Sequence, residues 1–113
     1  MPADPTAPAD TTMMRIVHDA LRRDLHRARI ALEAEPAPDD RQRVALARHL
    51  RWMTAFLDAH HQSEDEGLYR VVRQRAPQAV ELLDDMTRDH EVVAAAVARL
   101  DDVYLYPVSR LAG

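Results

Sequence analysis

The sequence predicts an all-α protein, folded as an antiparallel up-down helix bundle. Only two glycines occur among its 113 residues, and the Asn-Gly and Asp-Gly pairs typical of β-hairpins are absent. Apolar side chains recur at alternating three- and four-residue steps through three long segments, as on the inward faces of packed helices. Breaks that contain proline separate these segments. Together these observations predict three long helices joined by short turns.

The boundaries of the expected helices follow from the prolines. Pro36 and Pro38 cannot continue a helix, so the first helix is expected to end before them and the second to begin after them. An interior glycine costs about 1 kcal/mol in a helix, so a kink is expected near Gly67. Pro77 suits the first turn of a third helix, and Pro107 is expected to end the ordered chain. The expected parts are a disordered Pro/Ala-rich tail, one helical domain and a C-terminal tail: residues 1–12, 13–106 (helices about 12–34, 40–75 and 77–104) and 107–113.

Composition excludes several classes of function. The chain has 19 acidic and 15 basic side chains, interspersed in sequence, with a formal net charge of −4. Nucleic-acid binding needs clustered basic residues, so no nucleic-acid partner is expected. No segment approaches the roughly 20 apolar residues of a membrane span, and the N-terminus lacks the regions of a secretory signal. Because cysteine is absent, a reducing compartment is compatible, and we expect a cytoplasmic protein with no membrane partner.

Histidine interrupts each of the three apolar stripes, at His18, His60 and His90. At a rise of 1.5 Å per residue, His60 and His90 lie about 20 Å from the turn that joins their helices. His18 and His60 lie about 25 and 31 Å from the loop that joins the first two helices. These two distances agree to within about one helical turn, so the two residues are expected at a similar level. Glu64 follows His60 by one turn on the same face. The full stripes are Met14, His18, Leu21, Leu25, Ala28 and Leu32; Leu46, Leu50, Met53, Leu57, His60, Glu64, Leu68 and Val71; and Leu83, Met86, His90, Val93, Val97 and Leu100.

An inward layer of three histidines and one glutamate indicates a metal site. Burying Glu64 is costly unless a cation compensates its charge, and imidazole with carboxylate suits iron, manganese or zinc. The alternative is a metal-free polar layer in the core. His61 and Asp65 share a second face, and they either join the ligands or point toward a neighbouring helix or solvent. His49 lies about 16 Å along the helix from His60, too far to share its metal.

Three motifs carry a resemblance to a known family. FLDAHHQSEDEGLY (56–69) resembles the second-helix signature of hemerythrin-like HHE cation-binding proteins. IVHDALRRDL (16–25) and DDMTRDHEVV (84–93) resemble the first- and third-helix motifs, in the family's order and spacing. The resemblance implies three long helices of a four-helix bundle that holds a non-haem di-iron or related centre.

The resemblance also implies a ligand set, with three departures from the family pattern, the first being Arg70 where the family commonly has proline. The positions that match the family's ligands are His18, His60, Glu64 and His90. Met86 stands one turn before His90, where oxygen-carrying hemerythrins have a second histidine. The fourth helix of the family, which supplies a histidine and a carboxylate, is largely missing, because residues 103–113 contain neither. We therefore expect an apolar groove along the three helices, covered by a second copy in a homodimer.

These features predict a small protein that binds a non-haem metal, iron first, with manganese and zinc as alternatives. The resemblance implies binding or sensing of a small diatomic molecule, oxygen or nitric oxide, or of peroxide. No nucleophile–base pair or phosphate-binding glycine loop points to a conventional enzyme, although peroxide decomposition is an alternative. The rival interpretation is a metal-free helical interaction module or an inactive truncated HHE domain.

Overall fold

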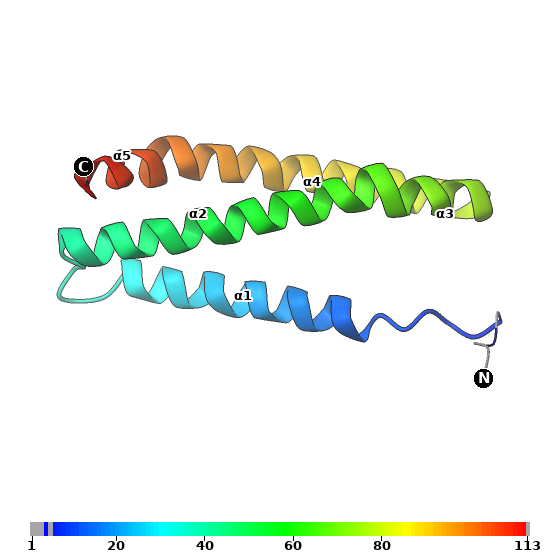
Figure 1. Ribbon diagram of the computed structural model, residues 1–113, viewed down its shortest axis with the longest axis horizontal. Helices are drawn as coiled ribbons and strands as arrows, with labels where there is room; N and C mark the ends of the chain where they lie inside the picture. The colour runs from blue at the N-terminus through cyan, green and yellow to red at the C-terminus, as the bar shows by residue number, and fades with distance from the viewer. Residues whose placement is uncertain (1–3, 5, 113) are drawn as a thin grey trace. The chain divides into compact units, whose positions relative to one another are not determined.

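The computed structural model of the chain describes residue 4 and residues 6–112 (Figure 1). Within these residues all regular secondary structure is helical and no strand occurs, so the predicted all-α class is confirmed. The chain divides into two compact units, residues 1–37 and 38–113, and each is described by itself.

The N-terminal unit contains one long helix, α1, over Thr12–Leu32. Asp10 accepts hydrogen bonds from the Thr12 hydroxyl at 2.6 Å and from the Thr12 backbone N–H at 3.0 Å. These two bonds lower the pKa of the Asp10 carboxyl below its ordinary value. The predicted tail, residues 1–12, falls partly on residues 1–3 and 5, outside the described residues, and Thr12 already belongs to α1.

The second unit begins with a nearly continuous helical arm. Helix α2 covers Asp40–Ser63, and its first turn is closed by a capping box in which the Asp39 side chain accepts from the Gln42 N–H at 2.8 Å. The arm continues through a π-helical turn, η1 (Glu64–Leu68), into α3 (Tyr69–Arg75). Instead of the kink predicted near Gly67, the structure has this wider turn around it. Single π turns inside α-helices are frequent at functional sites.

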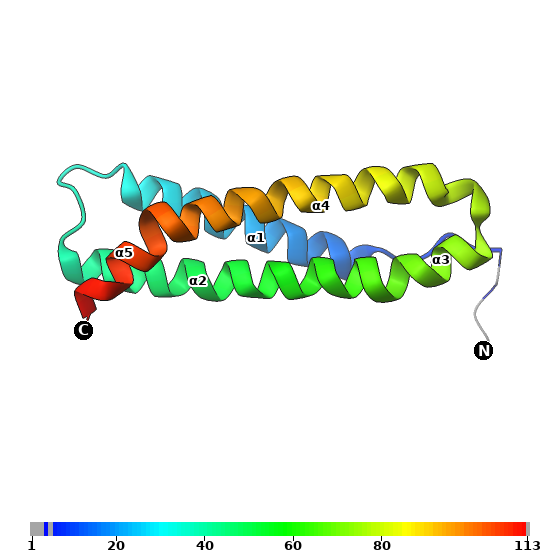
Figure 2. The same ribbon diagram turned by 90° about the horizontal axis from the view of Figure 1, so that it is seen from above.

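A second arm returns along α2 (Figure 2). It consists of a 3-10 turn, a long helix, a π-helical turn and two short terminal helices: η2 (Pro77–Ala79), α4 (Val80–Leu100), η3 (Asp101–Leu105), α5 (Tyr106–Ser109) and η4 (Arg110–Ala112). Helical structure thus extends past the end predicted near Tyr104. The reason is local: Pro107 lies in the first turn of α5, where a helix does not need the missing N–H.

The apolar core of the second unit lies where α2 packs against η3 and α5. Its α2 side is formed by Ala47, Leu50 and Met53, and its other side by Leu105 and Val108. Met53 and Leu105 are 2% and 1% exposed, so removal of either side chain would open a cavity. In the part of the chain that the structure describes, no helix is both long and apolar enough to span a membrane.

Candidate metal centre

Glu64 is the only charged side chain among the described residues that is buried, with 6% of its surface exposed. It is the first residue of the π turn η1, four residues after His60 on α2. A carboxylate removed from water is destabilising unless hydrogen bonds or a cation compensate its charge. The partners of its two oxygens therefore decide what the site can do.

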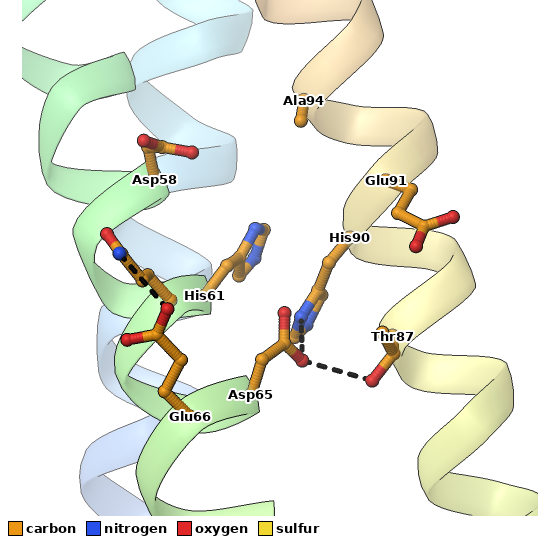
Figure 3. A pocket seen from close by; sticks show the side chains of 9 residues that line it. Asp58, His61, Asp65, Glu66, Thr87, His90, Glu91 and Ala94 are labelled. Atoms are coloured by element: carbon orange, nitrogen blue, oxygen red, sulfur yellow. Dashed lines mark hydrogen bonds and ion pairs between the residues drawn. The ribbon is translucent and has the colours of Figure 1, made fainter.

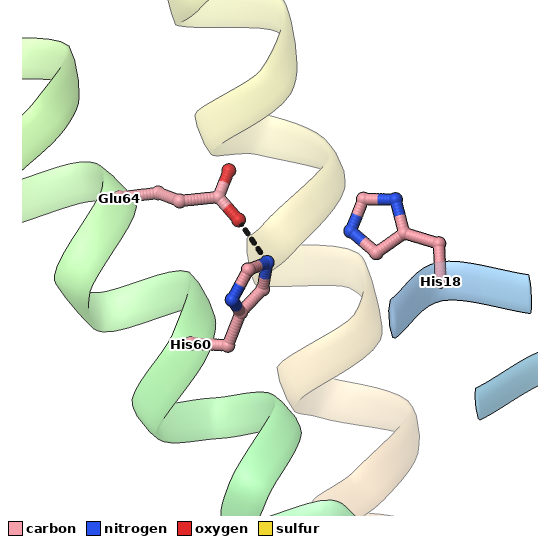
Figure 4. A group of neighbouring side chains, drawn as sticks. All are labelled: His18, His60 and Glu64. Carbon is pink, nitrogen blue, oxygen red and sulfur yellow. Dashed lines mark ion pairs between the residues drawn. The ribbon is translucent and has the colours of Figure 1, made fainter. Parts of the chain in front are cut away.

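Each carboxylate oxygen of Glu64 has its own partner. Nε2 of His60 lies 2.5 Å from Oε1, an ion pair across one helical turn (Figure 4). The Tyr69 hydroxyl donates a 2.5 Å hydrogen bond to Oε2, and the same hydroxyl lies 3.8 Å from Sδ of Met86 on α4. Each oxygen of Glu64 thus has one partner, and Oε1 is the oxygen that faces the imidazole nitrogen of His60.

The π turn explains why Tyr69 reaches Glu64. In a regular α-helix, residues five apart differ by about 140° in direction, so Tyr69 would lie away from the face of Glu64. The wider turn from Glu64 to Leu68 reduces this offset, and the Tyr69 N–H donates to the Glu64 carbonyl. Burial and the bond to Glu64 raise the pKa of Tyr69 above its ordinary value, so its hydroxyl stays protonated and donates.

Replacement of Tyr69 by phenylalanine is expected to lower the free energy of unfolding by about 1–3 kcal/mol, because buried Oε2 of Glu64 then loses its donor. Urea unfolding followed by circular dichroism measures this change. Tyr106→Phe is the matched control, since Tyr106 is 55% exposed. Equal losses in the two variants would contradict the role assigned to the Tyr69 hydroxyl.

A second polar cluster lies beside the first and joins the two arms (Figure 3). Asp65, the residue after Glu64, directs Oδ1 at α4. This oxygen lies 3.1 Å from Nδ1 of His90 and accepts a 3.1 Å hydrogen bond from the Thr87 hydroxyl. Asp65 is therefore the link between the π turn of one arm and the histidine of the other.

Two aromatic rings stack with the imidazole of His90. His61 stacks on it with ring centroids 3.9 Å apart and planes 7° apart, and Tyr69 lies 5.9 Å away. Burial, followed by the nearby His90, lowers the pKa of His61 below its ordinary value. His61 thus contacts the neighbouring helix α4 through His90, and its role as a ligand stays open.

An acidic cleft of about 350 Å³ opens over this second cluster. Its lining includes both stacked imidazoles and four carboxylates, and no lysine or arginine among the described residues: Asp58, His61, Gln62, Asp65, Glu66, Thr87, His90, Glu91 and Ala94. Such a lining favours cations over anions.

Comparison with known families agrees with the histidine and carboxylate chemistry of these clusters. The family model described as the hemerythrin HHE cation-binding domain matches residues 9–105. The chain belongs to the hemerythrin HHE cation-binding domain family. No curated protein and no solved structure gives a significant match.

The residues of this HHE domain fit a cation. Nε2 of His60 and Oε1 of Glu64 are a nitrogen and an oxygen donor of the kinds that divalent transition metals take, and they converge at 2.5 Å. Glu64 is buried, and its second oxygen is already bonded to Tyr69, as is common for carboxylates that bind metals.

The structure brings together some of the predicted ligands of the HHE domain. His60 and Glu64 contact each other as the four-residue spacing predicts. Nδ1 of His90 instead contacts Oδ1 of Asp65, in the second polar cluster. His18 lies on α1, in the N-terminal unit, and its role as a ligand stays a prediction. His49 stacks on Trp52 further along α2.

Sequence reasoning missed the contact of Tyr69 with Glu64 and the part of Thr87, and it left the role of Asp65 open. The contact of Tyr69 with Glu64 depends on a π turn, which does not show in an apolar stripe read at α-helical spacing. The signal that was present is the pair Asp65 and Gly67 inside the predicted helix, since both residue types have low helix propensity.

Proposed function

We propose that this HHE domain binds non-haem iron through His18, His60, Glu64 and His90. The observation that carries the proposal is the convergence of Nε2 of His60 and Oε1 of Glu64 at 2.5 Å, with Glu64 6% exposed. At this separation the two donor atoms are close enough for one ion to contact both. A metal ligand must be deprotonated, so metal binding is expected to release protons and to weaken at low pH.

Each ligand of the proposed centre has its own part. His60 and Glu64 come from one arm of the second unit, and His90 comes from the other. His18 is proposed as a further nitrogen ligand from the N-terminal unit. Imidazole and carboxylate together suit iron, with manganese and zinc as alternatives.

The small molecule that we propose for the iron is dioxygen, nitric oxide or peroxide. Bound iron would supply open coordination positions and one-electron chemistry for such a molecule. The protein's own part is to hold Glu64 through Tyr69 and to keep the donor pair out of water. The absence of cysteine is compatible with a reducing interior, so we propose the cytoplasm as the compartment.

Metal analysis of the purified chain tests the metal. After anaerobic loading with ferrous iron and desalting, the wild type is expected to retain iron near stoichiometry, and His60→Ala to lose it. His49→Ala is the matched control, because His49 lies on the same helix and stacks on Trp52. A wild type that retains no iron, manganese or zinc would favour the metal-free interaction module instead.

The same iron-loaded protein is used to determine which small molecule binds. Optical spectra recorded on exposure to oxygen and then to nitric oxide are expected to change for the wild type and not for His60→Ala. Gas evolution on addition of peroxide would favour peroxide decomposition over simple binding. Unchanged spectra with every molecule would contradict this part of the proposal.

We also propose that the partner of the chain is a second copy of itself. Trp52 and Phe56 on α2 are 66% and 43% exposed and stack on each other, and Phe56 stacks on His60. A second copy that covers these rings would remove apolar surface from water beside the proposed metal ligand. Light scattering coupled to size exclusion is expected to give twice the mass of one chain, and a monomer at all concentrations would contradict the proposal.

A further inference from the structure

We propose that Asp65 is a positioning residue that sets the tautomer of His90 and thereby directs Nε2 of that ring to the metal. The inference rests on the proposed function, since it takes His90 to be a ligand. It assigns Asp65 a task separate from that of Glu64, which precedes it in the π turn η1.

The hydrogen bonds of Asp65 fix the direction of donation. Oδ1 lies 3.1 Å from both the Thr87 hydroxyl and Nδ1 of His90 (Figure 3). An ionised carboxylate can only accept hydrogen bonds. With Asp65 as the acceptor, Nδ1 of His90 is the donor in this hydrogen bond.

The tautomer follows from this donation. A neutral imidazole that is protonated at Nδ1 has its lone pair at Nε2, the nitrogen that remains to bind a metal. A carboxylate that accepts from the other nitrogen also raises the basicity of the ligating one and fixes the ring. Asp65 thus prepares His90 without touching the metal.

The surroundings of His90 leave its ring little freedom. His61 stacks on it at 3.9 Å, Tyr69 lies 5.9 Å away, and the side chain of His90 is 13% exposed. Thr87 lies three residues before His90 on α4 and bonds to the same oxygen of Asp65. Two rings and one shared carboxylate oxygen therefore hold the imidazole before any metal arrives.

Asp65→Asn in the chain of residues 1–113 tests the effect on metal binding. Affinity for Zn²⁺ and for anaerobic Fe²⁺ is measured by competition with a chelator, and it is expected to fall about 10–100-fold. Asp58→Asn is the matched control, because Asp58 lines the same cleft and the change removes the same charge. Thr87→Val, which leaves the carboxylate in place, is expected to weaken binding less than Asp65→Asn.

The tautomer itself is measured without any metal. Nitrogen-15 NMR of the imidazole side chains in the metal-free wild type is expected to show His90 protonated at Nδ1. In Asp65→Asn that preference is expected to weaken, whereas in Asp58→Asn it is expected to stay, with circular dichroism showing that all variants fold.

Two results would overturn the inference: a wild-type His90 protonated at Nε2, or equal metal affinity in Asp65→Asn and Asp58→Asn. A wild type that binds no metal would overturn the proposed function and the metal role of His90. The NMR measurement would then still decide whether Asp65 sets the tautomer, so the two failures are distinguishable.

Discussion

Replacement of Glu64 by glutamine is expected to weaken metal binding by at least about 100-fold, beyond the range typical of residues that only support a ligand. The change keeps the size and shape of the side chain and removes its charge. A neutral amide is a poor ligand and cannot compensate the charge of a divalent ion in a buried site. Chelator competition with Zn²⁺ and anaerobic Fe²⁺ measures the loss.

The metal-free fold of this variant is expected to survive. The amide oxygen of the new side chain can still accept from the Tyr69 hydroxyl, and its NH₂ group can donate to Nε2 of a neutral His60. The free energy of unfolding is therefore expected to change by about 1 kcal/mol or less. In this variant metal affinity is thus expected to fall while the free energy of unfolding hardly changes. A purely structural role of Glu64 would not give this combination.

Glu66→Gln is the matched control for Glu64→Gln. Glu66 belongs to the same π turn, but it is exposed and its described contact is a 3.3 Å hydrogen bond from Gln62. Its replacement is expected to leave metal affinity within about twofold, because an exposed charge is screened by solvent. Retention of wild-type affinity by Glu64→Gln would remove Glu64 from the proposed centre.

The pair of His60 and Glu64 was predictable because its geometry is local. Residues four apart share a face of any α-helix, and the π turn begins only at Glu64. The burial of Glu64 followed from its place in the apolar stripe, and the all-helical class followed from the stripes and the scarcity of glycine.

The surroundings of His90 were not predictable in the same way. From the sequence, the histidines were placed by their distance from the turns, with a rise of 1.5 Å per residue in ideal helices. Such distances place a residue along its helix only to within about one turn. The π turn changes the direction of the side chains after Glu64, so Tyr69 contacts Glu64, and the rings of His61 and Tyr69 both stack with that of His90. Such contacts across two arms depend on packing, which periodicity does not contain.

The second large effect is expected in the core, where Leu105→Ala should lower the free energy of unfolding by about 2–5 kcal/mol. Leu105 is 1% exposed and ends the π turn η3, which packs against α2. The loss combines the removed apolar surface with the cavity that remains. Small domains have a total stability of about 5–15 kcal/mol, so this variant is expected to unfold at much lower urea.

Two further variants distinguish loss of packing from disturbance of the π turn. Val103 lies in the same turn and is 72% exposed, so Val103→Ala is expected to change stability by about 0.5 kcal/mol or less. Leu105→Met keeps the volume and is expected to cost less than about 1.5 kcal/mol, which covers the case in which Leu105→Ala does not fold. If Val103→Ala cost as much as Leu105→Ala, the turn itself and not the buried leucine would hold the return arm on α2. Burial instead predicts that the loss of stability is largest for Leu105→Ala, smaller for Leu105→Met and smallest for Val103→Ala. Only the buried position leaves a cavity when its side chain is shortened.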